Sequence, residues 1–240
     1  MIDKFLNYLK AKNYAPNTIR TYKSALAPLR GRDINLVTAV DIIMILARYD
    51  DPATAASKLS TLNTFFGWAI EQNLIQHNPA EGVGPIPTKE RLPTPIPEND
   101  LKKIFECVAT MSLPEQTYFY LIRFLAMKPS EALSLRAEDI SWVDQVVLIN
   151  SRYGKRHTPF AAGDDKLFAL LRKLCREREG SLFLSTHKRQ ASYYWAYRRW
   201  QRVVEYTGFD YTIEQLRQTR IIEWLDTGID PKTISRWVGG

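Results

Sequence analysis

The protein has 240 residues, of which 45% are hydrophobic, so the chain is long enough for one large domain or two ordinary ones with a buried core. No stretch approaches the roughly 18 uninterrupted apolar residues of a membrane span, and the start lacks an apolar secretory region. We therefore expect a cytoplasmic protein. Cys107 and Cys175 lie far apart without metal-ligand spacing, so neither a metal nor a cofactor is expected. The formal net charge of +7 permits a polyanionic partner without establishing one.

The first 84 residues show helical periodicity throughout, with apolar residues recurring at three- and four-residue spacings. The predicted helices are marked by Phe5, Leu6 and Leu9, by Pro16-Asn17-Thr18, by residues 38–49 and by residues 53–72. Asn73 and the pair Asn78-Pro79 should end the last helix, because these residue types favour turns over helix interiors. Residues 1–84 are therefore predicted to form a small helical domain.

Five prolines interrupt residues 85–97. Proline lacks a backbone donor and pushes the residue before it toward an extended conformation. We therefore predict that these residues form a semi-rigid linker between two domains.

Residues 98–240 are predicted to form a second, mainly helical domain. Helices are predicted over residues 98–107, 115–127, 130–135, 164–178, 192–207, 212–226 and 231–238. Between the third and fourth of these helices the period changes. Residues 143–149 and 156–160 are short β-rich runs on either side of Ser151-Arg152-Tyr153-Gly154, a pattern that predicts a hairpin. The expected fold class is mainly α with one small antiparallel sheet.

Four sequence motifs occur in a fixed order along the chain. They are FLNYLKAKNYAPNTIRTY (residues 5–22), KLSTLNTFFGWAIEQNLIQHNP (58–79), FLAMKPSEALSL (124–135) followed by EDI, and TIEQLRQTRIIEWLDTG (212–228), which runs on to residue 239. They resemble the core-binding domain and the two arginine boxes, GLRxSELLxLxxxDI and HxLRH, of the tyrosine recombinases (phage integrases). The resemblance covers essentially the whole chain. It implies a SAM-like helical core-binding domain, a mainly helical recombinase domain, and double-stranded DNA as the partner.

The resemblance also implies which residues stand at the family's catalytic positions. That family cleaves DNA with a tyrosine nucleophile. Two arginines bind the scissile phosphate, and a lysine and histidine-type residues transfer protons and make further contacts there. The position of the first arginine holds Lys128, which keeps the positive charge but lacks the two parallel N–H donors of a guanidinium. The hairpin lysine falls near Ser151, with Arg152 and Lys155 as possible substitutes.

The second arginine falls on Arg217 and is intact, but its surroundings differ from the family pattern. The two histidine positions of that box hold Glu214, whose carboxylate would repel a phosphate, and Gln218. The last family histidine falls on Gly240, and no tyrosine follows Tyr211. We therefore expect a recombinase fold that does not cleave DNA, with Lys128, Lys155 and Arg217 as remnants of the site. An ion pair of Arg217 with Glu214 or Glu131 is the alternative interpretation of that arginine.

Binding to a duplex depends mainly on neutralising phosphates, which needs no catalytic residues. The predicted DNA-contacting residues are Thr18, Arg20, Lys23, Lys58 and Asn63 in the first domain and Arg152, Lys155, Arg156, Lys188, Arg189, Arg198 and Arg202 in the second. The run around Arg198 also fits the solvated face of an ordinary helix. The aromatic residues beside it favour packing over base stacking.

These observations favour a clamp of two domains around duplex DNA that regulates or represses recombination or integration. By analogy, this setting implies a nucleoid-associated protein of bacterial, archaeal or phage origin that is carried on a mobile element. One alternative is a shortened form of an active site-specific recombinase. Another is a protein–protein scaffold, whose binding would be insensitive to salt. We expect a monomer in solution, with at most weak self-association.

Overall fold

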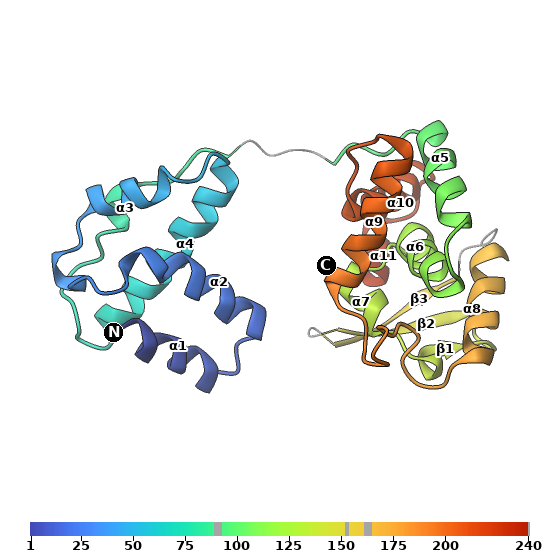
Figure 1. Ribbon diagram of the computed structural model, residues 1–240, viewed down its shortest axis with the longest axis horizontal. Coiled ribbons are helices and arrows are strands. Elements are labelled where there is room, and N and C mark those ends of the chain that lie inside the picture. The colour runs from blue at the N-terminus through green and yellow to red at the C-terminus, as the bar shows by residue number, and fades with distance from the viewer. Residues whose placement is uncertain (89–92, 152–153, 161–164, 240) are drawn as a thin grey trace. The chain divides into compact units, whose positions relative to one another are not determined.

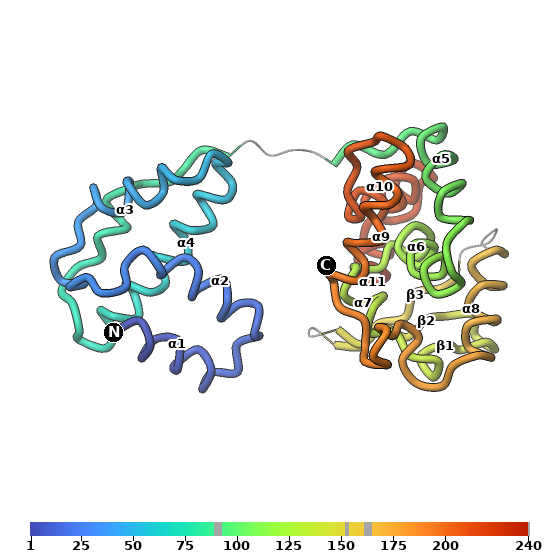
Figure 2. Tube along the Cα trace, in the orientation of Figure 1, coloured from blue at the N-terminus to red at the C-terminus, as the bar shows by residue number. Residues whose placement is uncertain are grey.

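Two units make up the chain, Met1–Arg91 and Leu92–Gly240, and each has its own hydrophobic core. The computed structural model describes residues 1–88, 93–151, 154–160 and 165–239. Figures 1 and 2 trace the path of the chain through each unit. Within these residues no helix has both the length and the apolar character needed to cross a membrane.

The first unit is helical, as its periodicity predicts. Its elements are α1 (Ile2–Ala11), α2 (Pro16–Leu26), η1 (Ala27–Leu29), η2 (Ile34–Leu36), α3 (Ala39–Leu46), α4 (Pro52–Glu71) and η3 (Glu81–Val83). Helix α4 supplies the centre of the core with Leu62, Phe65 and Phe66, which are fully buried. Phe5 of α1 packs edge-on against Phe65, with 5.3 Å between ring centroids. The remaining helices bury their apolar faces against this centre.

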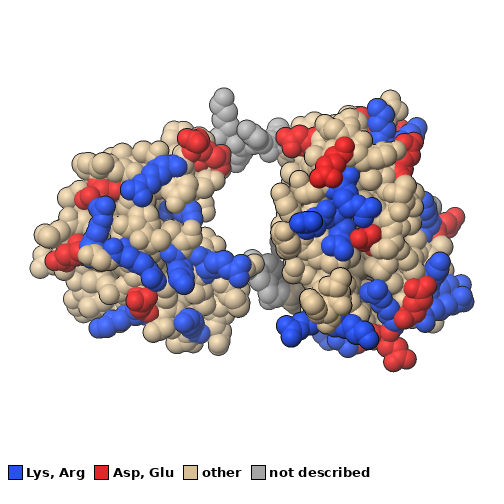
Figure 3. All heavy atoms as spheres, viewed as in Figure 1, with Lys and Arg blue, Asp and Glu red and all other residues tan. Residues whose placement is uncertain are grey.

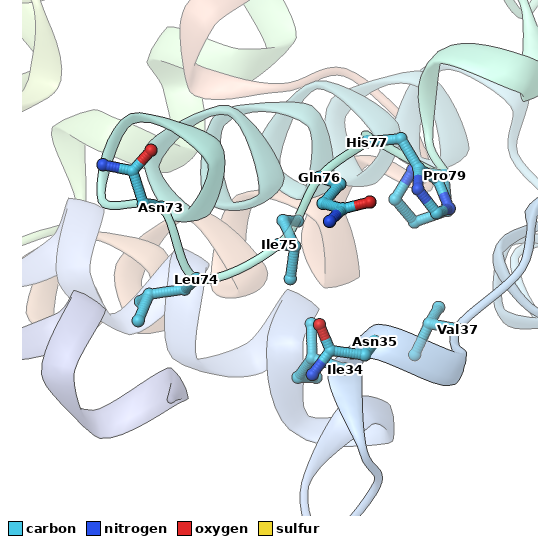
Figure 4. A pocket seen from close by; sticks show the side chains of 9 residues that line it. All are labelled: Ile34, Asn35, Val37, Asn73, Leu74, Ile75, Gln76, His77 and Pro79. Atoms are coloured by element: carbon cyan, nitrogen blue, oxygen red, sulfur yellow. The ribbon is translucent and has the colours of Figure 1, made fainter.

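Both ends of α4 are set by local side chains. Asp51 accepts a hydrogen bond from the backbone N–H of Thr54, which is an N-cap interaction. Just after the helix, Asn73 takes a left-handed conformation with φ of 53°, which asparagine tolerates better than most residues. The chain then runs back beside α4, and the segment from Asn73 to Pro79 lines a pocket together with η2 (Figure 4). The prediction that the helix ends here is confirmed.

The second unit combines helices with one small sheet. Its helical elements are α5 (Glu98–Ala109), α6 (Leu113–Leu125), α7 (Pro129–Ser134), η4 (Ala137–Asp139), α8 (Asp165–Glu177), α9 (Tyr193–Thr207), α10 (Ile213–Asp226) and α11 (Pro231–Val238). Helix α6 is buried on most sides and packs against both α8 and α10 (Figure 1). Its left-handed end at Ala126, with φ of 47°, leads the chain into α7.

The sheet is antiparallel with the strand order β1-β2-β3. Its strands are β1 (Ile140–Ser141), β2 (Val146–Ser151) and β3 (Gly154–Pro159), with Val147 paired to Thr158. The hairpin is confirmed, but the prediction that its first strand starts at Val143 is wrong. Residues 142–145 form a turn, across which the hydroxyl of Ser141 donates a hydrogen bond to Asp144. Val143 within this turn is 93% exposed. The short strand β1 was not predicted.

Helix α11 closes the sheet side of the second unit. It packs against β3 and α10, and Ile234 and Val238 join Trp224 and Ala126 in a small apolar cluster. Asp230 caps its first turn by accepting from the N–H of Thr233. This packing brings the last turn of α11 beside α7 and β3, where the candidate site lies.

Candidate functional site

Three cationic side chains from separate elements meet at the C-terminal end of α11. Lys128, just before α7, donates from Nζ to the carbonyl of Gly239 at 2.8 Å. Arg156 of β3 donates from Nε to the carbonyl of Trp237 at 2.7 Å. Arg217 of α10 lies 3.5 Å from the carbonyl of Val238. Helix C-termini carry unpaired carbonyls and partial negative charge, so cations are stabilised there.

Arg156 lies in a different place from the one predicted. Instead of standing at the tip of the hairpin as a phosphate contact, it forms two hydrogen bonds of 2.7 Å with Glu131 of α7. The two side chains are only 10% and 8% exposed. Arg156 and the fully buried Thr158 share one face of β3, whereas Lys155 faces solvent. The interaction with Glu131 therefore occupies the two Nη donors that a phosphate would need.

The carboxylate of Glu131 is held in its charged form. Burial alone would raise its pKa, but hydrogen bonds from Arg156 and from the backbone N–H of Lys128 bring the pKa below its ordinary value. Glu131 also forms the capping box of α7 through that N–H, at 2.9 Å. One carboxylate thus ties the start of α7 to the sheet.

Arg217 is paired within its own helix. Its Nη1 donates to Glu214 at 2.8 Å, and its Nε donates to the carbonyl of Ala126 at 2.9 Å. Of the two carboxylates considered as partners from the sequence, Glu214 is the one that binds it. Ala126 stands at the glycine of the first box motif and still takes a positive φ, so the bond from Arg217 braces an uncommon backbone conformation.

An exposed basic surface of the second unit lies on α9 and on the turn before it (Figure 3). Its exposed members are Lys188, Arg189, Arg198 and Arg202. Arg198 lies over the ring of Tyr194, and Arg202 lies 3.9 Å from Glu115 while remaining more than half exposed. These side chains are open to solvent on one face of the unit, as a phosphate-binding surface requires.

Arg199 on the same helix has a structural role that the sequence did not reveal. It is 27% exposed, stacks on Trp195 with 4.4 Å between its guanidinium carbon and the ring centroid, and donates to Glu115 at 2.9 Å. Burial would raise the pKa of Glu115, but Ser112 and Arg199 lower it below the ordinary value.

In the first unit, the predicted residues lie on α2 and α4. Arg20 and Lys23 are exposed and Thr18 is half-buried. Figure 3 shows a row of basic side chains across this region. Lys58 of α4 donates to Ser24 of α2 at 3.3 Å, which joins the two helices.

Other predicted residues have different surroundings. Asn63 accepts a hydrogen bond from Asn78 at 3.0 Å and so helps to hold the segment after α4. Arg152 and Gly240 lie outside the described residues. The pocket in Figure 4 has no lysine or arginine in its lining.

Comparison with known proteins adds to this geometry. Residues 95–239 match the phage integrase family, and residues 2–73 match the phage integrase N-terminal SAM-like domain. The tyrosine recombinase XerC of Listeria welshimeri is 25% identical over 176 residues, covering 66% of this chain and 59% of that protein. XerC of Psychromonas ingrahamii is 23% identical over 211 residues, covering 80% of this chain and 71% of that protein. The chain therefore spans about three-fifths of the length of the Listeria relative.

Solved structures share the fold. A lambda integrase dimer bound to a COC' core site superimposes with a TM-score of 0.82 at 20% identity, covering 100% of this chain and 93% of that chain. The Tn1549 transposon integrase in complex with circular intermediate DNA superimposes with a TM-score of 0.75 at 13% identity, covering 100% and 91%. Both the helical first unit and the second unit with its small sheet are thus found in DNA-bound proteins of known structure.

Proposed function

Because the chain belongs to the phage integrase family, we propose that it binds double-stranded DNA with both of its units and does not cleave it. The observation that carries this proposal is a division among the basic side chains. Arg20 and Lys23 on α2 and Arg198 and Arg202 on α9 are exposed to solvent, whereas Lys128 and Arg217, at the positions of the family's two arginines, bind groups of the protein itself.

The DNA-binding half of the proposal rests on the exposed cations. The exposed cations that we propose as contacts are Arg20 and Lys23 in the first unit and Lys155, Lys188, Arg189, Arg198 and Arg202 in the second. The half-buried Lys58, Thr18 and Asn63 are proposed to contribute beside them. Long, flexible basic side chains gain affinity by displacing condensed counterions from the duplex. Arg152 stays a predicted contact, and Arg156 is left out because Glu131 binds it.

The absence of cleavage is proposed from the surroundings of Lys128 and Arg217. A lysine lacks the two parallel donors with which arginine clamps a phosphate, and the Nζ of Lys128 already binds the carbonyl of Gly239. Glu214 places a carboxylate 2.8 Å from the guanidinium of Arg217. A phosphate bound there would lie beside that negative charge, which disfavours the more highly charged transition state.

The role that follows is regulation. A protein that occupies recombination sites without cutting them competes with active recombinases for the same DNA, and so represses or times recombination and integration. We propose that it acts in the cytoplasm on nucleoid DNA, as a monomer at low concentration. Carriage on a mobile element would fit this role.

A selection from random duplexes tests both halves of the proposal. The purified protein is incubated with the pool, the bound fraction is amplified, and the same reactions are denatured and run on a gel that detects covalent protein–DNA adducts. We expect one sequence to be enriched and no adduct to form, with an active family recombinase on its own site as the positive control. A covalent adduct would contradict the proposal that the protein does not cleave DNA. The absence of an enriched sequence would favour the alternative of a protein–protein scaffold.

A further inference from the structure

Helix α9 divides its aromatic residues between the core and the solvent. Trp200 is 4% exposed, and its indole N–H donates to the carbonyl of Tyr211 at 2.6 Å. Trp195 packs edge-on against Tyr118, with 5.7 Å between the ring centroids. The expectation that the aromatic residues of this region favour packing is therefore right for the two tryptophans.

The same expectation is wrong for the three tyrosines at the start of the helix. Tyr193, Tyr194 and Tyr197 are 60%, 64% and 44% exposed. Single exposed apolar residues are common on protein surfaces, but a cluster of large ones marks a binding surface. We call these three residues the tyrosine patch.

Contacts within α9 hold two of these rings in place. Tyr194 and Tyr197 are stacked, with 6.5 Å between ring centroids and 24° between the ring planes. The guanidinium carbon of Arg198 lies 6.0 Å from the centroid of Tyr194, and its Nη1 donates to the hydroxyl of that tyrosine at 3.4 Å. Side chains that are already held in one arrangement lose less conformational entropy when they bind a ligand.

Exposed cations flank the tyrosine patch along the chain. Lys188 and Arg189 lie in the turn before α9, and Arg202 follows Arg198 after one helical turn. No aspartate or glutamate occurs between residues 181 and 204. The charges around the patch therefore favour a polyanionic partner.

Aromatic rings beside cations match one form of polyanion in particular. In a duplex the faces of the bases are stacked on one another, whereas each base of an unpaired strand presents a free face to an aromatic side chain. Stacking on such a ring then adds to the contacts that cations make with the phosphates. We propose that the tyrosine patch binds the bases of single-stranded DNA while the adjoining cations bind its phosphates.

This proposal rests on the proposed function in one respect, because the same cations of α9 would serve duplex and single-stranded DNA. The stacking on tyrosine is independent of duplex binding. A surface that binds both forms favours sites at which a duplex is locally opened, since a ligand shifts an equilibrium toward the state that it binds better.

Two strands with the same phosphates test the stacking. One is an oligothymidine of about 12 nucleotides, and the other is an abasic strand of the same length. Fluorescence anisotropy at one salt concentration should show that the parent binds the oligothymidine about tenfold or more tightly than the abasic strand. Equal affinities for the two strands would overturn the proposal.

Substitutions identify the rings. Tyr194→Leu and Tyr197→Leu keep an apolar side chain but remove the ring, so each should weaken oligothymidine binding about fivefold or more and leave abasic binding unchanged. Tyr194→Phe should bind like the parent. Tyr206→Leu is the matched control, because Tyr206 is 63% exposed in the last turn of α9, well away from the patch. Leucine variants that remain folded by thermal unfolding and bind oligothymidine like the parent would overturn the proposal.

Photochemical cross-linking locates the contact. An oligothymidine with one thymine replaced by 5-iodouracil should cross-link to the tryptic peptide of residues 190–198, which contains all three tyrosines of the patch. Cross-links confined to other peptides would overturn the assignment. Binding to a duplex of the same length reports separately on the proposed function, which fails alone if duplex binding is absent while the preference for oligothymidine persists.

Discussion

The guanidinium of Arg156 and the carboxylate of Glu131 share two hydrogen bonds of 2.7 Å, which join β3 to α7 across 25 residues of sequence. Both side chains are largely shielded from water. Parallel, charge-assisted bonds of this kind are strong, and losing one partner leaves the other charge buried without compensation. The pair therefore acts as a structural link between the hairpin and α7.

Acid sensitivity should reveal this pair. The folded-state pKa of Glu131 lies below the ordinary value of 4.5, so the unfolded chain takes up the proton more readily. The contribution of Glu131 to the free energy of unfolding is complete above about pH 4.5. It is lost as the pH falls through the lower pKa that Glu131 has in the folded state. We expect Glu131→Gln to lower the free energy of unfolding at pH 7 by about 3–5 kcal/mol.

The same variant should lose stability less steeply below pH 4.5, which urea unfolding at a series of pH values measures. Glu106→Gln on the exposed face of α5 is the matched control. A slope that is unchanged in Glu131→Gln would mean that the pair does not hold the carboxylate charged.

Neutralising Glu214 should strengthen DNA binding. Glu214→Gln removes the carboxylate that faces Arg217 and leaves its Nη1 free to approach a phosphate. We expect the Kd for duplex DNA to fall by about three- to tenfold and the salt slope to steepen by about one. Fluorescence anisotropy measures both quantities, with Asp226→Asn at the far end of α10 as the control. Equal changes in the two variants would indicate a general charge effect.

Two neighbouring arginines of α9 should behave oppositely. Arg198→Ala removes an exposed cation and should weaken DNA binding by about 1 kcal/mol with little change in stability. Arg199→Ala strips the partly buried Glu115 of its partner and of the stacking on Trp195, so it should lower the free energy of unfolding by about 2 kcal/mol. Thermal denaturation and anisotropy separate the two effects. Similar losses of DNA affinity at unchanged stability would show that Arg199 also faces the duplex.

Sequence periodicity predicts most of this fold because the determining forces are local. Pro16 at a first helical turn and the Thr212–Gln215 capping box mark where α2 and α10 begin. The two-residue strand β1 is too short to show a period of its own, and it exists because it pairs with β2. The helices thus follow from the sequence, whereas β1 depends on its partner strand.

The candidate site was only partly predictable for the same reason. The pairing of Arg217 with Glu214 follows from their spacing of three residues on one helix. The burial of Arg156 does not, because α11 comes to cover that face of the hairpin from 81 residues away. Thr158, two positions along the same strand, is buried on the same face, and its burial likewise appears only in the structure.

The most direct test of the account is the salt dependence of binding to an enriched duplex, measured by fluorescence anisotropy between 50 and 200 mM salt, about the range over which phosphate contacts dominate. The exposed cations of the two units predict a slope of log K against log salt of about −5 to −7, together with a weaker, shallower response in a protein carrying both Arg198→Ala and Lys23→Ala. A slope near zero, or binding unaffected by these two substitutions, would contradict the claim that this chain holds duplex DNA through those surfaces.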